Sequence, residues 1–152
     1  MDRLILPPLP SLVKRLPIIP IYKGYDLKEV GEYVKSLTPQ VNELYQNIPF
    51  IEINLAPLDF HPNFVYELVV DVGSGLPFHQ DDFSHVITGV IGISTTTEDY
   101  TRIKCGDTEI REVPNNHSIL LFPSQWVHGV NKSYNKRETI NAWWVDAGFT
   151  HQ

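Results

Sequence analysis

A histidine and an aspartate two residues apart, in the segment LPFHQDD, have the clearest capacity for metal chemistry in this sequence. His79 and Asp81 share one face if the backbone is extended, because alternate side chains of a strand point the same way. Two ligands at this spacing cannot close a metal site, so a third must come from elsewhere. The best candidate is His128 in FPSQWVHGV, since it begins a new extended piece after a turn that contains proline.

Two neutral imidazoles and one carboxylate leave open positions on a metal, and non-haem Fe(II) oxygenases use this ligand set. A His-x-Asp pair alone is weak support, because many solvated loops contain one. A second feature adds to it: nine residues after His128 comes Arg137, with Thr139 on the same face of an extended strand. A guanidinium beside a hydroxyl suits the far carboxylate of a dicarboxylate. Taken alone, Arg137 in NKRE reads as a solvated charge at the end of a strand.

The elements that must position these residues are predicted to be mostly strands. Asp26 caps a helix over 26–37, and Thr38 is predicted to be the N-cap, before Pro39, of a second helix that runs through Tyr45. The turn Cys105-Gly106-Asp107 predicts a hairpin. Runs rich in β-branched and aromatic residues predict strands at 50–55, 64–71, 85–94, 100–105, 108–113, 118–122 and 138–146. This order predicts a β-sandwich or barrel with one or two N-terminal helices packed on one side.

Length and composition limit the classes of protein further. The 152 residues fit one domain, 25–152, after a proline-rich arm, 1–24, which is expected to pack along the domain. An arm that mediates a dimer is the alternative, and the oligomeric state stays open. The net charge of −6 argues against binding to a phosphate backbone, and no apolar run reaches the ~20 residues of a membrane span. The single cysteine, Cys105, allows no internal disulfide and favours the cytoplasm.

A spaced pattern of residues runs through the predicted strands. In chain order it comprises Gly73, Gly75, His79, Asp81, the strand SILLFP, His128, Arg137 and Thr139. The pattern resembles the Fe(II)/2-oxoglutarate-dependent dioxygenase superfamily, and is most similar to its small prolyl-hydroxylase-like and phage members, over roughly residues 64–146. The resemblance implies a double-stranded β-helix, or jelly-roll.

Carried over residue by residue, the resemblance implies that His79, Asp81 and His128 bind Fe(II). It also implies that Arg137 and Thr139 hold the C5 carboxylate of the cosubstrate 2-oxoglutarate. With O2, such an enzyme hydroxylates a C–H bond of a peptidyl, amino-acid or small-molecule substrate and releases succinate and CO2. Asp81 favours hydroxylation, because related halogenases have a small residue in its place. The primary substrate is not identified by the sequence.

Two further residues are assigned to the cosubstrate. Strand alternation places Thr139, Asn141 and Trp143 on the face of Arg137, toward the barrel interior, with Ile140, Ala142 and Trp144 opposite. Asn141 is therefore within reach of the cosubstrate, and a core amide is an equal alternative for it. Family members often have a tyrosine nine positions before the first ligand, where this chain has Val70. Tyr66 faces the same way on the expected strand and is assigned the role of that tyrosine.

Several alternatives stay open. Oxidative nucleic-acid demethylases of the superfamily end in an Arg-x5-Arg pair, whereas this chain has Trp143 at the second position, so a nucleic-acid substrate is not favoured. A cupin-like barrel that binds a metal or ligand without oxygenase activity is the rival of another class, although such cupins usually carry HxH and a Glu. His85 competes with His128 as the third ligand. Phe83, Trp126 and Trp143 either wall a substrate pocket or belong to the core.

Overall fold

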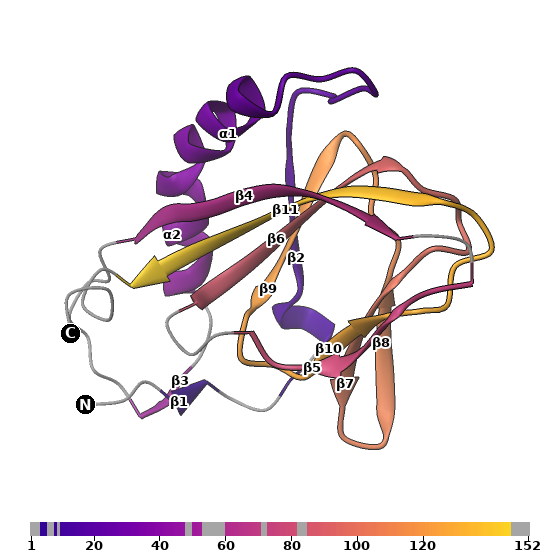
Figure 1. The fold of residues 1–152 in the computed structure, drawn as a ribbon. Helices are drawn as coiled ribbons and strands as arrows, with labels where there is room; N and C mark the ends of the chain where they lie inside the picture. The colour runs from indigo at the N-terminus through magenta and orange to yellow at the C-terminus, as the bar shows by residue number, and fades with distance from the viewer. Residues whose placement is uncertain are drawn as a thin grey trace.

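The computed structural model describes residues 4–5, 8, 10–47, 50–52, 60–70, 73–81 and 85–146. Strands dominate it, and both helices precede the long strands (Figure 1). The elements in chain order are β1 (Leu4–Ile5), η1 (Pro10–Leu12), β2 (Lys14–Pro17), α1 (Leu27–Ser36), α2 (Thr38–Gln46), β3 (Phe50–Glu52), β4 (Phe60–Val70), β5 (Leu76–His79), β6 (His85–Ser94), β7 (Thr101–Cys105), β8 (Thr108–Glu112), β9 (Ser118–Pro123), β10 (His128–Val130) and β11 (Arg137–Asp146).

Two antiparallel sheets make up the body of the protein. The larger has the strand order β2-β9-β6-β11-β4, and the smaller has the order β5-β10-β7-β8; β1 pairs with β3 apart from both. The central strands β6 and β11 are buried because apolar side chains such as Ile91 and Ile140 face the core. The predicted mostly β, jelly-roll fold with one or two N-terminal helices is confirmed, and the structure has two such α-helices, α1 and α2 (Figure 1).

The two helices lie on one side of the larger sheet (Figure 1). Asp26 accepts a hydrogen bond of 2.9 Å from the Lys28 amide at the start of α1, as an N-cap does. On α2, the Thr38 hydroxyl donates to the Lys35 carbonyl at 2.7 Å and accepts from Trp144 Nε1 at 3.1 Å. Thr38 therefore lies inside the first turn of α2 and ties that helix to β11, instead of capping it as predicted.

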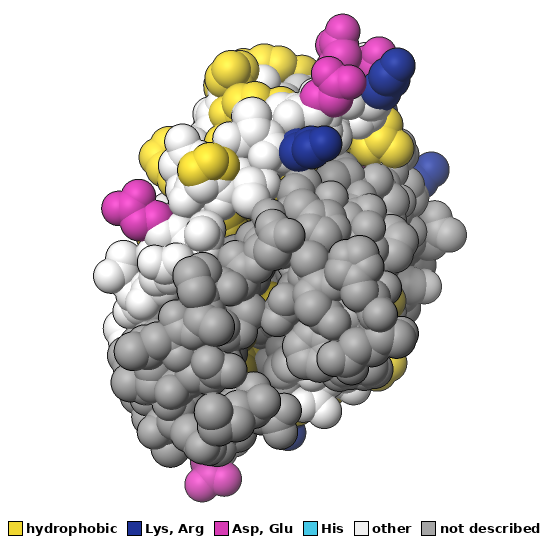
Figure 2. Space-filling model, turned by 90° about the vertical axis from the view of Figure 1, so that its left-hand side faces the viewer, with side chains coloured by type: hydrophobic (Ala, Val, Ile, Leu, Met, Phe, Trp, Pro, Cys, Tyr) yellow, Lys and Arg dark blue, Asp and Glu magenta, His cyan; other side chains and the backbone are white. Residues whose placement is uncertain are grey.

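The exposed side of α1 carries the charged residues Lys28, Glu29, Glu32 and Lys35. Figure 2 shows acidic and basic side chains standing close together at the end of the molecule where α1 lies. Val30 and Val34 face inward and are buried, so α1 is amphipathic in the way its sequence period predicts. Among the residues described, no helix has the length and apolar character that a bilayer span requires.

Part of the proline-rich arm belongs to the larger sheet. Residues 14–17 form β2 and pair with β9, which places this strand at the edge of the sheet. Arg15 on β2 donates to Glu112 Oε2 at 3.0 Å and to the Val113 carbonyl at 2.7 Å. An edge position suits a segment with proline at its end, because proline donates no ladder hydrogen bond. The boundary between residues 24 and 25 stays a prediction.

Candidate metal centre

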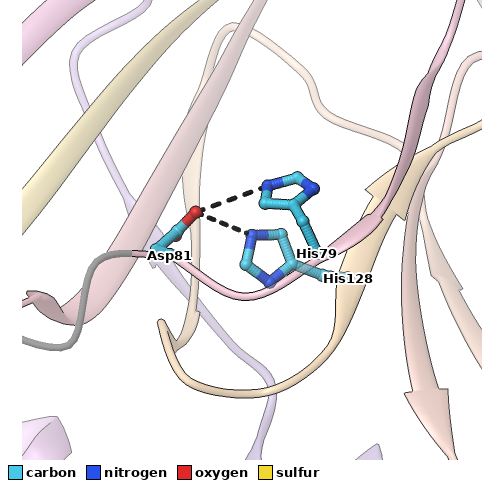
Figure 3. Close-up of side chains that lie close together, drawn as sticks. All are labelled: His79, Asp81 and His128. Atoms are coloured by element: carbon cyan, nitrogen blue, oxygen red, sulfur yellow. Dashed lines mark ion pairs between the residues drawn. The ribbon is translucent and has the colours of Figure 1, made fainter.

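Three side chains from distant parts of the sequence meet at one end of the smaller sheet (Figure 3). His79 ends β5 and His128 begins β10, and the two residues are paired in the ladder between these strands. Asp81 follows two residues after His79 and directs Oδ1 to 3.4 Å from His79 Nε2 and 3.3 Å from His128 Nε2. One ligand atom from each residue lies within 4.8 Å of the others.

Each histidine is oriented by a carbonyl two residues earlier. His79 Nδ1 lies 2.8 Å from the Pro77 oxygen, and His128 Nδ1 lies 2.6 Å from the Trp126 oxygen. A carbonyl oxygen only accepts, so Nδ1 of each ring carries a proton, and Nε2 of each ring faces Asp81. This is the arrangement in which an imidazole binds a metal through Nε2.

The carboxylate of Asp81 is ionised and held in place. Its Oδ2 accepts hydrogen bonds from Thr88 Oγ1 at 2.7 Å and from Trp143 Nε1 at 2.9 Å. Burial raises the pKa of Asp81, but the interactions with His128, Thr88 and Trp143 outweigh burial and lower the pKa to about 2. At neutral pH the Asp81 carboxylate is therefore ionised and places one negative charge beside the two imidazoles.

Among the three residues of the cluster, His79 is the exposed one. The side chains of His128 and Asp81 are 7% and 9% exposed, whereas that of His79 is 40% exposed. Phe122 packs edge-on against the His128 ring, with 4.9 Å between the ring centroids. A metal bound by the three residues would thus be reached by solvent or ligand past His79.

A cavity of about 100 Å³ extends from the cluster between the two sheets. The side chains of β11 that line it alternate along the strand, as extended backbone requires. They are Arg137, Thr139, Asn141 and Trp143. The intervening residues Ile140, Ala142 and Trp144 are buried on the opposite face, so the predicted division of this strand agrees with its structure.

Arg137 is a buried residue with a precise set of partners. Its Nη2 donates to Asp99 Oδ1 at 3.1 Å and to the Asn131 carbonyl and side-chain oxygens at 3.1 and 2.8 Å. Arg137 is 2% exposed, which excludes a solvated charge at the end of a strand. Its buried Nε has no hydrogen-bond partner among the residues that the structure describes. An unpaired buried donor on a cationic group is unfavourable, so an anionic acceptor suits this position.

Thr139 and Asn141 form a pair beside this guanidinium. Asn141 Nδ2 donates to Thr139 Oγ1 at 3.0 Å, and both residues are buried. Because the threonine oxygen accepts this bond, its own proton is directed to another acceptor. Asn141 therefore orients the hydroxyl within the cavity, where both residues lie.

The residue that pairs with Arg137 was not identified by sequence reasoning. Asp99 is 1% exposed and lies in the loop between β6 and β7. Burial raises the pKa of Asp99, but hydrogen bonds from Thr96 and Ser133 and the charge of Arg137 hold it below its ordinary value. The Thr96 amide donates to Asp99 Oδ2 at 2.7 Å and Ser133 Oγ to Oδ1 at 3.1 Å. An acidic residue in a polar loop reads as solvated, so only the fold identifies this one as buried.

Gly73 and Gly75, the two glycines of the sequence pattern, are each required for a different structural reason. Gly73 has φ of 83°, a left-handed conformation that favours glycine. Gly75 lies against β10, where an added Cβ would stand 2.7 Å from the Val130 oxygen and 2.8 Å from the Asn131 oxygen. Gly75 directly precedes β5 and permits its close approach to β10, where His79 pairs with His128.

The other residues that the sequence suggested for the site lie outside the three-residue cluster or outside the described part of the chain. Tyr66 lies opposite Asn141 in the backbone register of β4 and β11, and its side chain falls outside the described part of the chain, as does Phe83. His85 packs on Trp143, with 5.3 Å between ring centroids, and is not part of the three-residue cluster. Trp126 is 5% exposed and belongs to the hydrophobic core.

Comparison by sequence finds no matching family model and no matching curated protein. Comparison of structures finds several oxygenases. A prolyl-4-hydroxylase from Pseudomonas putida has a TM-score of 0.59 at 16% identity, over 90% of this chain and 73% of that one. An oxidoreductase of the 2OG-Fe(II) oxygenase family from Burkholderia pseudomallei has a TM-score of 0.59 at 11% identity, over 88% and 67% of the two chains.

A third similar structure is a prolyl hydroxylase from Trichoplax adhaerens, solved in complex with a hypoxia inducible factor peptide fragment. It has a TM-score of 0.54 at 18% identity, over 90% of this chain and 64% of that one. At such identities the likeness concerns the fold. The chain described here has the fold of 2-oxoglutarate- and Fe(II)-dependent oxygenases, in agreement with the resemblance of its sequence pattern.

Proposed function

We propose that this protein is an Fe(II)- and 2-oxoglutarate-dependent dioxygenase that hydroxylates a C–H bond of a peptidyl, amino-acid or small-molecule substrate. One observation carries the proposal: His79, Asp81, His128 and Arg137 line the same cavity, and ligand atoms of the first three lie within 4.8 Å of one another. A metal-binding cluster and a buried cationic anchor in one cavity are what a chelating organic acid needs at its two ends.

The donor set of the cluster fits Fe(II). Two imidazole Nε2 atoms and one carboxylate oxygen would hold the ion and leave positions on it open, and the Nδ1 hydrogen bonds direct both Nε2 atoms toward Asp81. When bound, iron together with O2 and 2-oxoglutarate supplies the oxidising power for hydroxylation, with succinate and CO2 as products. The chain itself supplies ligand geometry, a restricted cavity and the open side at His79.

The other end of the cavity fits the C5 carboxylate of 2-oxoglutarate. Arg137 lines this end, Asp99 and Asn131 accept from its Nη2 and so fix the plane of the guanidinium, and its Nε has no partner among the described residues. The Thr139 hydroxyl, oriented by Asn141, adds a neutral donor beside it. These groups bind and orient the cosubstrate by charge-assisted hydrogen bonds.

The substrate class is proposed from charge and from the similar structures. Two of these are prolyl hydroxylases and one was solved with a peptide fragment, which supports a peptidyl substrate for this chain. The net charge of −6 opposes a nucleic-acid substrate. We further propose a cytoplasmic location, because a chain with one cysteine forms no internal disulfide and suits a reducing compartment.

The test begins with binding under anaerobic conditions. Fe(II) and 2-oxoglutarate added to the protein should give a weak visible charge-transfer band. The band should be absent from His128→Ala, much weaker at equal cosubstrate in Arg137→Ala, and unchanged in His117→Ala, which alters an exposed histidine outside the cluster. If the wild-type protein binds metal but never 2-oxoglutarate, the chain is a metal-binding barrel without oxygenase activity.

Turnover then identifies the substrate. Succinate release should be stimulated by proline-containing peptides or amino acids above the uncoupled rate measured with 2-oxoglutarate alone. Stimulation by methylated oligonucleotides, and not by peptides or small molecules, would assign the protein to the nucleic-acid demethylases and contradict the substrate class proposed.

A further inference from the structure

The two oxygens of Asp81 have different surroundings. Oδ1 faces the Nε2 atoms of His79 and His128 at 3.4 and 3.3 Å (Figure 3). Oδ2 points the other way and accepts two hydrogen bonds, from Thr88 at 2.7 Å and from Trp143 at 2.9 Å. Both donors belong to the larger sheet, Thr88 to β6 and Trp143 to β11.

The proton of the Thr88 hydroxyl is committed to Asp81. Thr88 Oγ1 lies 2.7 Å from Asp81 Oδ2 and 2.8 Å from Ser124 Oγ, and a hydroxyl has a single proton. An ionised carboxylate only accepts, so Thr88 donates to Asp81 and Ser124 donates to Thr88. Ser124 is fully buried, and its carbonyl accepts from the Asp81 amide at 3.2 Å. The hydrogen-bond chain from Ser124 through Thr88 to Asp81 thus has a single direction.

The indole of Trp143 is placed by the strand that carries the cosubstrate residues. Trp143 lies on the cavity face of β11 with Arg137, Thr139 and Asn141. Indole Nε1–H donates and never accepts, so its bond to Oδ2 cannot reverse. Its neighbour Trp144 faces the opposite side and donates to Thr38 on α2.

We propose that Thr88 and Trp143 are positioning residues that restrict Asp81 to a single metal-ligating oxygen. With Oδ2 occupied by two donors, the carboxylate binds an ion through Oδ1 alone and cannot chelate it. A coordination position that a chelating carboxylate would fill is thereby kept for exogenous ligands. The proposal rests on the metal-binding part of the proposed function and does not depend on the identity of the substrate.

The test counts coordinated water on Mn(II) bound in place of Fe(II). Three single-atom protein ligands leave about three of six positions for water, and a chelating Asp81 would leave about two. Water-proton relaxation per bound Mn(II) should therefore fall by about a third in Trp143→Phe and in Thr88→Val. Mn(II) affinity should also fall, by about 10–100-fold, as is usual when a residue that orients a metal ligand is removed.

The chain offers matched controls for both variants. Trp144→Phe makes the same chemical change on the opposite face of β11, and should lower stability without altering relaxation per bound ion. Thr88→Ser keeps the hydroxyl and should restore wild-type relaxation. Unchanged relaxation per bound ion in both Trp143→Phe and Thr88→Val overturns the proposal, whatever their affinities. If wild-type protein binds no Mn(II), or His128→Ala binds it equally well, the metal site itself is wrong.

Discussion

Arg137 and Asp99 form a buried ion pair, with Nη2 and Oδ1 3.1 Å apart and side chains only 3% and 1% exposed. The pair joins the first residue of β11 to the loop between β6 and β7. The positive charge at the far end of the cavity is therefore balanced within the protein before any ligand arrives. We expect the Arg137–Asp99 pair to affect both the unfolding free energy of the protein and its affinity for 2-oxoglutarate, and the two effects can be measured separately.

Replacing Asp99 by Asn should destabilise the metal-free protein strongly. The substitution leaves the buried guanidinium of Arg137 without its counter-charge, which typically costs about 3–5 kcal/mol of unfolding free energy. Urea unfolding followed by circular dichroism measures the change. The control is Asp107→Asn at the exposed turn between β7 and β8, for which we expect a change within about 0.5 kcal/mol. Equal effects at both positions would contradict the importance of the buried pair.

Arg137→Lys should weaken 2-oxoglutarate binding although it preserves the charge. In Arg137, Nη2 bonds Asp99 and Asn131, whereas Nε has no partner among the described residues and is left for the ligand. A lysine ammonium lacks this planar fork and has only one nitrogen for both tasks. Calorimetric titration of Ni(II)-loaded protein should show at least about a 10-fold rise in Kd, or about 1.4 kcal/mol. Arg15→Lys, on the edge strand β2, should leave Kd unchanged. An unaltered Kd in Arg137→Lys would mean that another group anchors the cosubstrate.

Gly75→Ala should disturb the metal centre from a distance. The new Cβ would stand 2.7 Å from the backbone oxygen of Val130 and push β5 away from β10. Because His79 and His128 are paired across these strands, we expect weaker Ni(II) binding together with about 1–3 kcal/mol of lost stability. Gly31→Ala in α1 is the control, since its Cβ meets nothing within 4 Å and alanine favours the helix. If Gly75→Ala binds Ni(II) with wild-type affinity, the spacing between β5 and β10 does not control metal binding.

The acid stability of the protein should depend on Glu109. Hydrogen bonds from Arg102 and Arg111 outweigh partial burial and lower the pKa of Glu109 from 4.5 to about 2. A carboxyl group whose pKa is lower in the folded protein stabilises it above its unfolded pKa, and this contribution is lost as the pH falls. The Glu109→Gln variant should therefore lose stability relative to wild type at pH 7, and the difference should shrink between pH 4.5 and about 2.

Thermal unfolding at a series of pH values measures this difference. Glu43→Gln removes a carboxylate from an exposed position on α2 and serves as the control, with a small difference that does not change through this range. If the difference in stability between wild type and Glu109→Gln stays constant as the pH falls, the stabilising contacts of Glu109 with the two arginines do not depend on its ionisation.

Strands with strong local patterns could be predicted from the sequence. The run HVITGVIGIS was expected to form a strand over 85–94, and β6 has these bounds, because its β-branched residues fit a strand buried on both faces. β5 was not among the predicted strands. It has four residues, one of them Pro77, and depends on pairing with β10, which is itself three residues long. Pairing over such short segments comes from the tertiary fold, and local propensity does not report it.

In the candidate site, too, some residues could be predicted from the sequence and others could not. His79, Asp81 and His128 could be selected because their chemistry and spacing are visible in the sequence, and the fold brings their ligand atoms together. Their supporting contacts could not be predicted. Trp143 was expected on the cavity face of its strand, but its indole donates to Asp81, 62 residues earlier, and no periodicity indicates such a partner.

Both sheets contribute to the metal cluster. The histidines belong to the smaller sheet, whereas the carboxylate between them is bonded to Thr88 and Trp143 of the larger one. An ion held there would cross-link the two halves of the sandwich, so separating them during unfolding would first require its release. At an ion concentration 100 times Kd, this adds about 2.7 kcal/mol to the unfolding free energy. The supply of iron would then govern how long each copy of the protein survives proteases, as well as how many copies are active.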